Sequence, residues 1–256
     1  MDDTTESKQP PLDFFFWVMK ICATTLGETA GDLLSMTLSL GYAASTGMLM
    51  TFFLVVLALQ LRVRLYHPLL YWSVILATST AGTTTSDFMD RTLGLGYARG
   101  SAILIVLLVT SLLCWQLSEG SLSVQRLVNR RAELFYWVTV LISNTLGTAM
   151  GDYLSDDSGL GFAGAAVLVG SLLAVISVLY FRSKLSHVLL FWAAFVLTRP
   201  FGAELGDLLT KDAAHHGLGL GTIYSSLVLA AVLLASIAYV SLRGDKQNFN
   251  AASDHF

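Results

Sequence analysis

An acidic residue follows a small-residue step at four matching places in this sequence. Each acid lies 15 residues after a tryptophan and inside a long apolar stretch. A carboxylate in such a stretch is energetically costly, so four matched copies predict a common site rather than unrelated residues. The four pairs are Trp17 with Asp32, Trp72 with Asp87, Trp137 with Asp152, and Trp192 with Asp207.

Further acids lie close to two of these positions. Glu28 precedes Asp32 by four residues and Glu204 precedes Asp207 by three, so each pair shares one helix face. Carboxylates, joined by nearby hydroxyl groups, are ligands that favour hard divalent cations such as Mn²⁺ or Mg²⁺ over Cu⁺ or Zn²⁺. Clustered carboxylates also repel one another, so metal binding would release protons. The pattern predicts a cation site capable of proton–metal exchange.

Two basic residues also lie within apolar stretches. Arg199 precedes Asp207 by eight residues, which is about two helical turns, and we interpret it as a counter-ion for an acid when no substrate is bound. Lys20 lies near the start of its stretch, and we expect it to extend its ammonium group to the membrane surface.

Small residues spaced four apart precede each aspartate. This spacing lets a neighbouring helix approach closely, so the small residues alone are explained by helix packing. The aspartates, which flank the packed face, are what predicts a site. The small residues are Gly27 and Gly31, Gly82 and Ser86, Gly147 and Gly151, and Gly202 and Gly206.

The elements that must position these residues are membrane helices. The 256 residues are 54% hydrophobic and 13% charged, with a mean hydropathy of +0.65, which is too apolar for an ordinary soluble domain. A membrane-spanning helix needs about 20 apolar residues. We therefore predict an all-α, polytopic membrane protein with eight transmembrane helices, at 13–35, 42–61, 68–89, 95–117, 134–154, 160–181, 187–209 and 218–242.

The four tryptophans also define the repeats. They are separated by 55, 65 and 55 residues, which predicts four helical hairpins arranged as two pairs in a single membrane domain. An even number of spans in each repeat makes the repeats parallel. The predicted repeats are 13–61, 68–117, 134–181 and 187–242, and residues 118–133 form a linker that is either a basic amphipathic helix on the membrane or a solvated loop.

The repeated motif resembles that of a known family. Thr25-Leu26-Gly27 with Gly31-Asp32, and the matching Thr145-Leu146-Gly147 with Gly151-Asp152, are its best copies. The chain is similar here to the bacterial "uncharacterised membrane-anchored protein" family, which is built from four copies of a short repeat of unknown function. The likeness runs from about Phe14 to Val240 and implies membrane location and repeats, but no chemistry.

The placement of charge gives an orientation. Ten basic residues fall in the N-terminus, in the loops after the second, fourth and sixth spans, and in the C-terminus. Only Arg91, Arg99 and Lys211 fall on the opposite side. The positive-inside rule then predicts a multi-pass protein of the bacterial inner membrane with both termini cytoplasmic. The lipid bilayer is the expected partner, nucleic acid is not, and a homo-oligomer remains open.

The favoured function is a secondary transporter or exporter of a divalent metal cation, with Mn²⁺ preferred, driven by protons. One alternative is a proton-coupled exporter of an organic cation that uses aromatics such as Trp17 and Tyr42. Another is a membrane scaffold or partner subunit without transport, whose acids form interhelical hydrogen bonds. No nucleophile or nucleotide-binding motif is present, so we expect neither an enzyme nor a cofactor.

Overall fold

The computed structural model describes residues 8–124, 129–213 and 217–253, with side chains described as far as residue 243. Within these ranges the chain is all-helical and contains no strand. Its long helices are α1 (Phe14–Asp32), α2 (Tyr42–Arg62), α3 (Pro68–Asp87), α4 (Tyr97–Glu119), α5 (Arg130–Asp152), α6 (Gly161–Arg182), α7 (His187–Thr210) and α8 (Thr222–Ser253).

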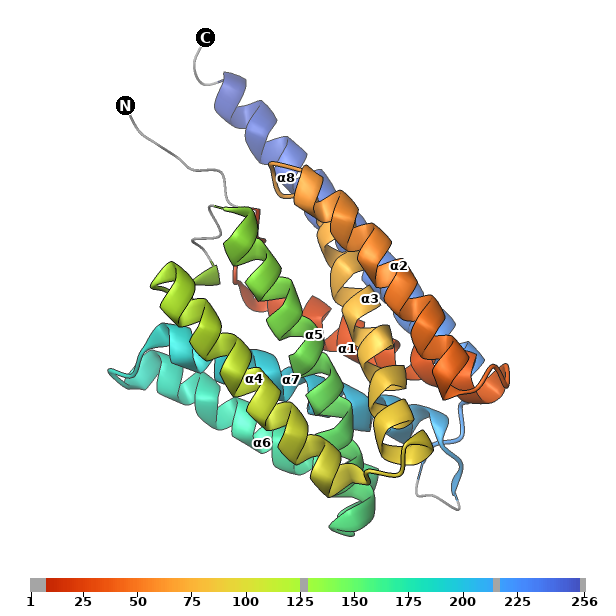
Figure 1. Cartoon of the computed structure of the whole chain (residues 1–256). Coiled ribbons are helices and arrows are strands. Elements are labelled where there is room, and N and C mark those ends of the chain that lie inside the picture. Colours follow the sequence, from red (N-terminus) through yellow and green to blue (C-terminus); the bar gives the residue numbers. More distant parts are fainter. Residues whose placement is uncertain (1–7, 125–128, 214–216, 254–256) are drawn as a thin grey trace.

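The first helices of the four repeats form an inner ring. Helices α1, α3, α5 and α7 pack in that order, and α7 closes the ring by packing on α1. The second helices lie outside, each on the first helix of the following repeat: α2 on α3, α4 on α5, α6 on α7, and α8 on α1 (Figure 1). The repeats therefore interlock around the ring.

This arrangement corrects the prediction of hairpins in two pairs. Helix α3 packs on α5 across the longer central connection just as α1 packs on α3, so the halves are not separate. The two helices of one repeat are joined in sequence, but the main partner of each second helix belongs to the next repeat. Residues 125–128 of the predicted linker lie outside the described residues, and its remainder is short, since α4 ends at Glu119 and α5 begins at Arg130.

The outer helices have the properties of membrane spans. Among the described residues, five helices are long and apolar enough to cross a bilayer: α2, α4, α6, α7 and the segment Thr222–Arg243 of α8. Val106, Val167 and Leu227 on these helices are 64%, 69% and 66% exposed. Helices α1, α3 and α5 carry more polar residues, most of which are buried inside the ring. The fold is that of a membrane protein with a polar interior.

The motif glycines lie where neighbouring ring helices approach one another. A Cβ atom on Gly82 would lie 3.0 Å from the backbone of Asn144, so α3 and α5 are nearly in backbone contact there. At all four motif glycines an added Cβ atom would meet the residue three places before the motif glycine of the next repeat: Gly27 meets Ser79, Gly82 meets Asn144, Gly147 meets Arg199, and Gly202 meets Thr24.

The helix geometry changes at the end of the ring that carries the motif aspartates, which we call the acidic end. Three short π-helical segments begin immediately after the motif aspartates: η1 (Leu33–Thr37), η2 (Phe88–Thr92) and η4 (Tyr153–Asp157). Such segments are frequent at functional sites. The fourth repeat differs, because α7 continues as an α-helix to Thr210 and is followed by a longer turn.

The other end of the ring is filled by aromatic side chains. Trp72 and Trp137 are buried there, and the hydroxyl groups of Tyr71 and Tyr136 are 2.7 Å apart. Ring centroids of Tyr71 and Trp137 are 5.5 Å apart, a typical distance for packed aromatics. The constant spacing from tryptophan to aspartate thus separates an aromatic half of the ring from an acidic half.

The close approach at Gly82 predicts a position-specific effect of a single methyl group. Gly82→Ala should destabilise the protein by about 1–3 kcal/mol, because the backbone of α5 cannot move away cheaply. Gly47→Ala on α2 is the matched control, since nothing lies within 4 Å of its added Cβ atom. Thermal unfolding in detergent measures both, and equal melting temperatures for the two variants would contradict the ring packing.

Candidate functional site

The four motif aspartates are buried at one end of the inner ring. Asp32, Asp87 and Asp152 are the last residues of α1, α3 and α5, and Asp207 lies in the last turn of α7. None of the four is more than 5% exposed. They therefore face the interior of the bundle rather than lipid or solvent.

Two basic side chains join these acids in pairs. Lys211 Nζ lies 2.6 Å from Asp32 Oδ2 and 3.2 Å from Asp207 Oδ1. Arg91 Nε lies 3.1 Å from Asp87 Oδ1, and its Nη2 lies 3.3 Å from Asp152 Oδ2. Each base follows the aspartate of its own repeat by four residues and reaches the aspartate of the next repeat, so the fourfold repeat carries a twofold pattern of charge.

Lys211 was not among the residues that the sequence singled out as part of the site. It lies just beyond α7, at the same spacing from Asp207 as Arg91 has from Asp87, and that shared spacing was the available signal. Burial disfavours the charged form of Lys211, but the Asp207 and Asp32 carboxylates outweigh burial and hold its pKa above the ordinary value. The two carboxylates therefore favour the charged form of Lys211 at this end of the ring.

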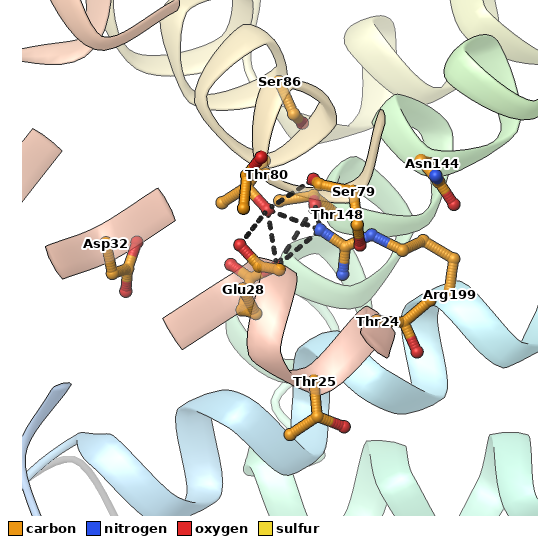
Figure 2. Close-up of polar contacts among 12 residues, drawn as sticks. Thr24, Thr25, Glu28, Asp32, Ser79, Thr80, Ser86, Asn144, Thr148 and Arg199 are labelled. Carbon is orange, nitrogen blue, oxygen red and sulfur yellow. Dashed lines mark hydrogen bonds and ion pairs between the residues drawn. The ribbon is translucent and has the colours of Figure 1, made fainter. Parts of the chain in front are cut away.

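Arg199 pairs with Glu28 at the centre of the ring. Its Nη2 atom lies 2.8 Å from Glu28 Oε2 and donates to Thr148 Oγ1 at 2.7 Å (Figure 2). The same atom donates to Thr83 Oγ1 at 2.5 Å. Thr83 and Thr148 occupy the position of Glu28 in their own repeats. Three repeats thus direct one oxygen each to a single nitrogen of the fourth, and the acid that Arg199 contacts is Glu28 rather than Asp207.

Lys20 extends the polar interior deeper into the ring. It is fully buried, with Nζ 4.1 Å from the centre of the Phe195 ring and 3.5 Å from Asn144 Oδ1. Asn144 in turn donates to Thr78 Oγ1 at 2.9 Å. The prediction that Lys20 reaches the membrane surface is wrong, because its side chain points inward, where an amide and an aromatic face receive it.

Three carboxylates come close enough to share one cation. Oxygens of Glu28, Asp32 and Asp207 lie within 4.8 Å of one another, the one such group of three among the described residues. Their donor set fits a hard divalent ion, which binds carboxylate oxygen. Around Arg91 the matching acids are Asp152 and Asp87, but Thr148 stands where Glu28 stands in the first copy. The group of three carboxylates is therefore confined to the interface of α1 and α7.

Glu204 is the sixth predicted acid. It is 1% exposed, and its Oε2 atom has no hydrogen-bond partner within the described part of the chain. A Cβ atom on Gly151 would lie 2.9 Å from its Oε1 atom, so Glu204 is directed towards α5. It interacts electrostatically with Asp207, Asp152 and Glu28. Glu204 thus belongs to the same acidic region without joining the group of three.

The interior holds more acids than bases. The six predicted acids are all buried, and so are Asp90 on η2 and Glu133, which pairs with Lys8. The basic side chains that accompany the other acids are Lys20, Arg91, Arg199 and Lys211. Uncompensated charge is expensive in an apolar surrounding. The buried acids therefore outnumber the bases, and the excess negative charge requires protons or bound cations to balance it.

Fold and site together define an all-helical membrane protein with four internal repeats and a buried acidic centre. The chain matches a family described as a repeat of unknown function (DUF347) at residues 15–66, 70–121, 135–186 and 190–244. The protein belongs to this family, as the sequence motif predicted. No curated protein and no solved structure matches the chain.

The central ion pair predicts a coupled effect of two substitutions. Arg199→Met should destabilise the protein by about 3–5 kcal/mol, because it leaves Glu28 buried without its cation. Adding Glu28→Gln removes the stranded charge and should recover a large part of that loss. Chemical denaturation of the four proteins in a double-mutant cycle measures the coupling, and strictly additive losses would contradict a direct Glu28–Arg199 pair.

Proposed function

We propose that this protein is a secondary transporter of a hard divalent metal cation, with Mn²⁺ the first candidate, and that it exchanges the ion for protons. The proposal includes eight transmembrane helices, location in the bacterial inner membrane and both termini in the cytoplasm. The observation that carries it is the group formed by Glu28, Asp32 and Asp207, whose oxygens lie within 4.8 Å of one another inside the ring.

Charge balance supports coupling to protons. The acids in excess of the bases carry protons when the site is empty, since an apolar interior does not hold uncompensated negative charge. A divalent cation can replace two of these protons without changing the total charge. Exchange of one divalent ion for two protons is therefore electrically neutral at the site.

The residues take different parts in this proposal. Glu28, Asp32 and Asp207 are the ion's carboxylate ligands. Asp87, Asp152 and Glu204 lie in the same acidic region, and they carry protons or receive the ion as it moves. Arg199 holds Glu28 in place through the 2.8 Å ion pair and balances its charge before the ion arrives.

Ring packing favours a small ion over an organic cation. Glycine contacts bring adjacent ring helices almost to backbone contact at Gly27, Gly82 and Gly202, and side chains of α7 fill the space beside Gly147. A bulky cation would need these contacts to open, whereas a bare metal ion needs only side-chain oxygens. A scaffold role accounts for the close packing, but gives no reason for an excess of buried acids over bases.

Replacement of a single ligand tests the transport function. Asp32→Asn should abolish Mn²⁺ flux into proteoliposomes while the protein stays folded, because the amide cannot supply a negative charge to the ion. Asp157→Asn is the matched control, since Asp157 is exposed on η4 and makes the same chemical change outside the site. Flux is followed by a Mn²⁺-quenched dye in the vesicles, and proton movement by a pH-sensitive dye.

The wild-type protein should move about two protons against each divalent ion if exchange at the site is electrically neutral. Folded wild-type protein that transports none of Mn²⁺, Mg²⁺ or protons would contradict the transporter and favour a scaffold. Equal flux through Asp32→Asn and Asp157→Asn would remove Asp32 from the site.

A further inference from the structure

The two bases at the acidic end are held in different ways. Arg91 donates from Nη1 to the Tyr42 hydroxyl at 3.2 Å, and its guanidinium lies 5.9 Å from the Tyr42 ring and 5.7 Å from the Tyr97 ring. With its two aspartates, Arg91 is fixed by four groups from different elements. It also stands within the π-helical segment η2. Arg91 is therefore a structural bridge.

Lys211 is held by its ammonium group alone. Nζ contacts Asp32 and Asp207, with Met36 Sδ at 3.9 Å as a weak third neighbour. The side chain is 24% exposed, so part of it already lies outside the acidic group. The backbone is anchored separately, because Lys211 N donates to Asp207 O at 2.9 Å and Gly219 N donates to Lys211 O at 2.8 Å. Rotation of the side chain can therefore withdraw the ammonium group while the backbone stays in place.

The two bases also differ in the acids they face. Lys211 lies on two members of the Glu28, Asp32 and Asp207 group, which has the geometry for a metal ion. Arg91 lies on a group in which Thr148 replaces the third carboxylate. The Lys211 ammonium group thus brings a single positive charge to a site whose three carboxylates could bind a divalent cation.

The geometry points to Lys211 as a tethered competitor for the cation site. Its ammonium group occupies the three-carboxylate group when no ion is bound, a divalent cation displaces it towards the exposed side, and its return promotes release of the ion. This inference rests on the proposed function and adds a selectivity rule. A monovalent ion brings no more charge than the ammonium it must displace, whereas a divalent ion brings twice as much. Lys211 therefore selects against K⁺ and Na⁺.

The wild-type chain offers a direct test that needs no substitution. An amine-reactive reagent is applied to the full-length protein in detergent, with and without saturating Mn²⁺, and labelled lysines are quantified by mass spectrometry. Labelling of Lys211 should rise severalfold with Mn²⁺, because the displaced ammonium group no longer bonds to Asp32 and Asp207. Lys184 is the internal control, since it is exposed and far from the acids in sequence, and its labelling should not change.

Two substitutions at Lys211 provide the second test. Lys211→Met removes the charge but keeps the length, and should tighten Mn²⁺ binding about tenfold and permit measurable K⁺ binding, because the competing charge is gone. Lys211→Arg keeps the charge and should leave Mn²⁺ affinity within about threefold of wild type. Isothermal titration with each ion measures the affinities, and the labelling experiment decides the matter if Lys211→Met does not fold.

The outcomes separate this inference from the function on which it rests. Mn²⁺ binding to the wild type with unchanged Lys211 labelling, or with no gain of affinity in Lys211→Met, would overturn the competitor while leaving the transporter intact. Absence of divalent-ion binding to folded wild type and to folded Lys211→Met would overturn both. Increased Lys211 labelling with Mn²⁺, together with tighter binding by Lys211→Met, supports both.

Discussion

The balance of charge inside the helical ring is the constraint on which the rest of this structure depends. The buried acids, which include the six predicted ones, outnumber the basic side chains of the interior, and each of Arg91, Arg199, Lys211 and Lys20 contacts an acid or, for Lys20, an amide and an aromatic ring. An apolar surrounding makes every uncompensated charge costly. The excess of acids over bases therefore requires protons or bound cations, and this requirement is the basis of the proposed exchange.

The four repeats together form this interior, and the residues that differ between repeats make it asymmetric. The glycine contacts recur around the ring and bring the same sequence positions of all four repeats together. At the level of Glu28 the other repeats carry Thr83, Thr148 and Ala203, and at the level of Arg199 they carry Thr24, Ser79 and Asn144. One acid and one base thus replace neutral residues at these two levels of the ring, and they create an asymmetric centre with one group of three carboxylates at its edge.

The sequence predicted the positions of the helices well, because turn residues bound them and five of them are long apolar runs. The predicted span at 42–61 corresponds to α2 (Tyr42–Arg62), and the span at 187–209 to α7 (His187–Thr210). The motif also located the buried acids, since a carboxylate that recurs within apolar sequence is too costly to face lipid in every copy. The sequence could not show which repeats pack against one another, because spacing does not reveal which face of a helix meets which neighbour. The structure has an interlocked ring of repeats instead of the predicted pairs of hairpins.

Side-chain partners were the least predictable part of the site. Spacing along one helix suggested Asp207 for Arg199, but the true partner, Glu28, lies on a helix more than 170 residues away in sequence. Lys20 was expected at the membrane surface because a buried lysine is rare, yet the polar interior accepts it. The bridge from Lys211 to Asp32 depends on closure of the ring between the first and last repeats, which no local pattern records.

Crystals of the full-length protein soaked in Mn²⁺ offer the most direct measurement of the central claim. Anomalous diffraction should reveal one Mn²⁺ ion coordinated by carboxylate oxygens of Glu28, Asp32 and Asp207, with the Lys211 ammonium group moved away from them. An anomalous map without a peak among these carboxylates at saturating Mn²⁺, with Lys211 still bonded to Asp32, would contradict a cation site in the ring.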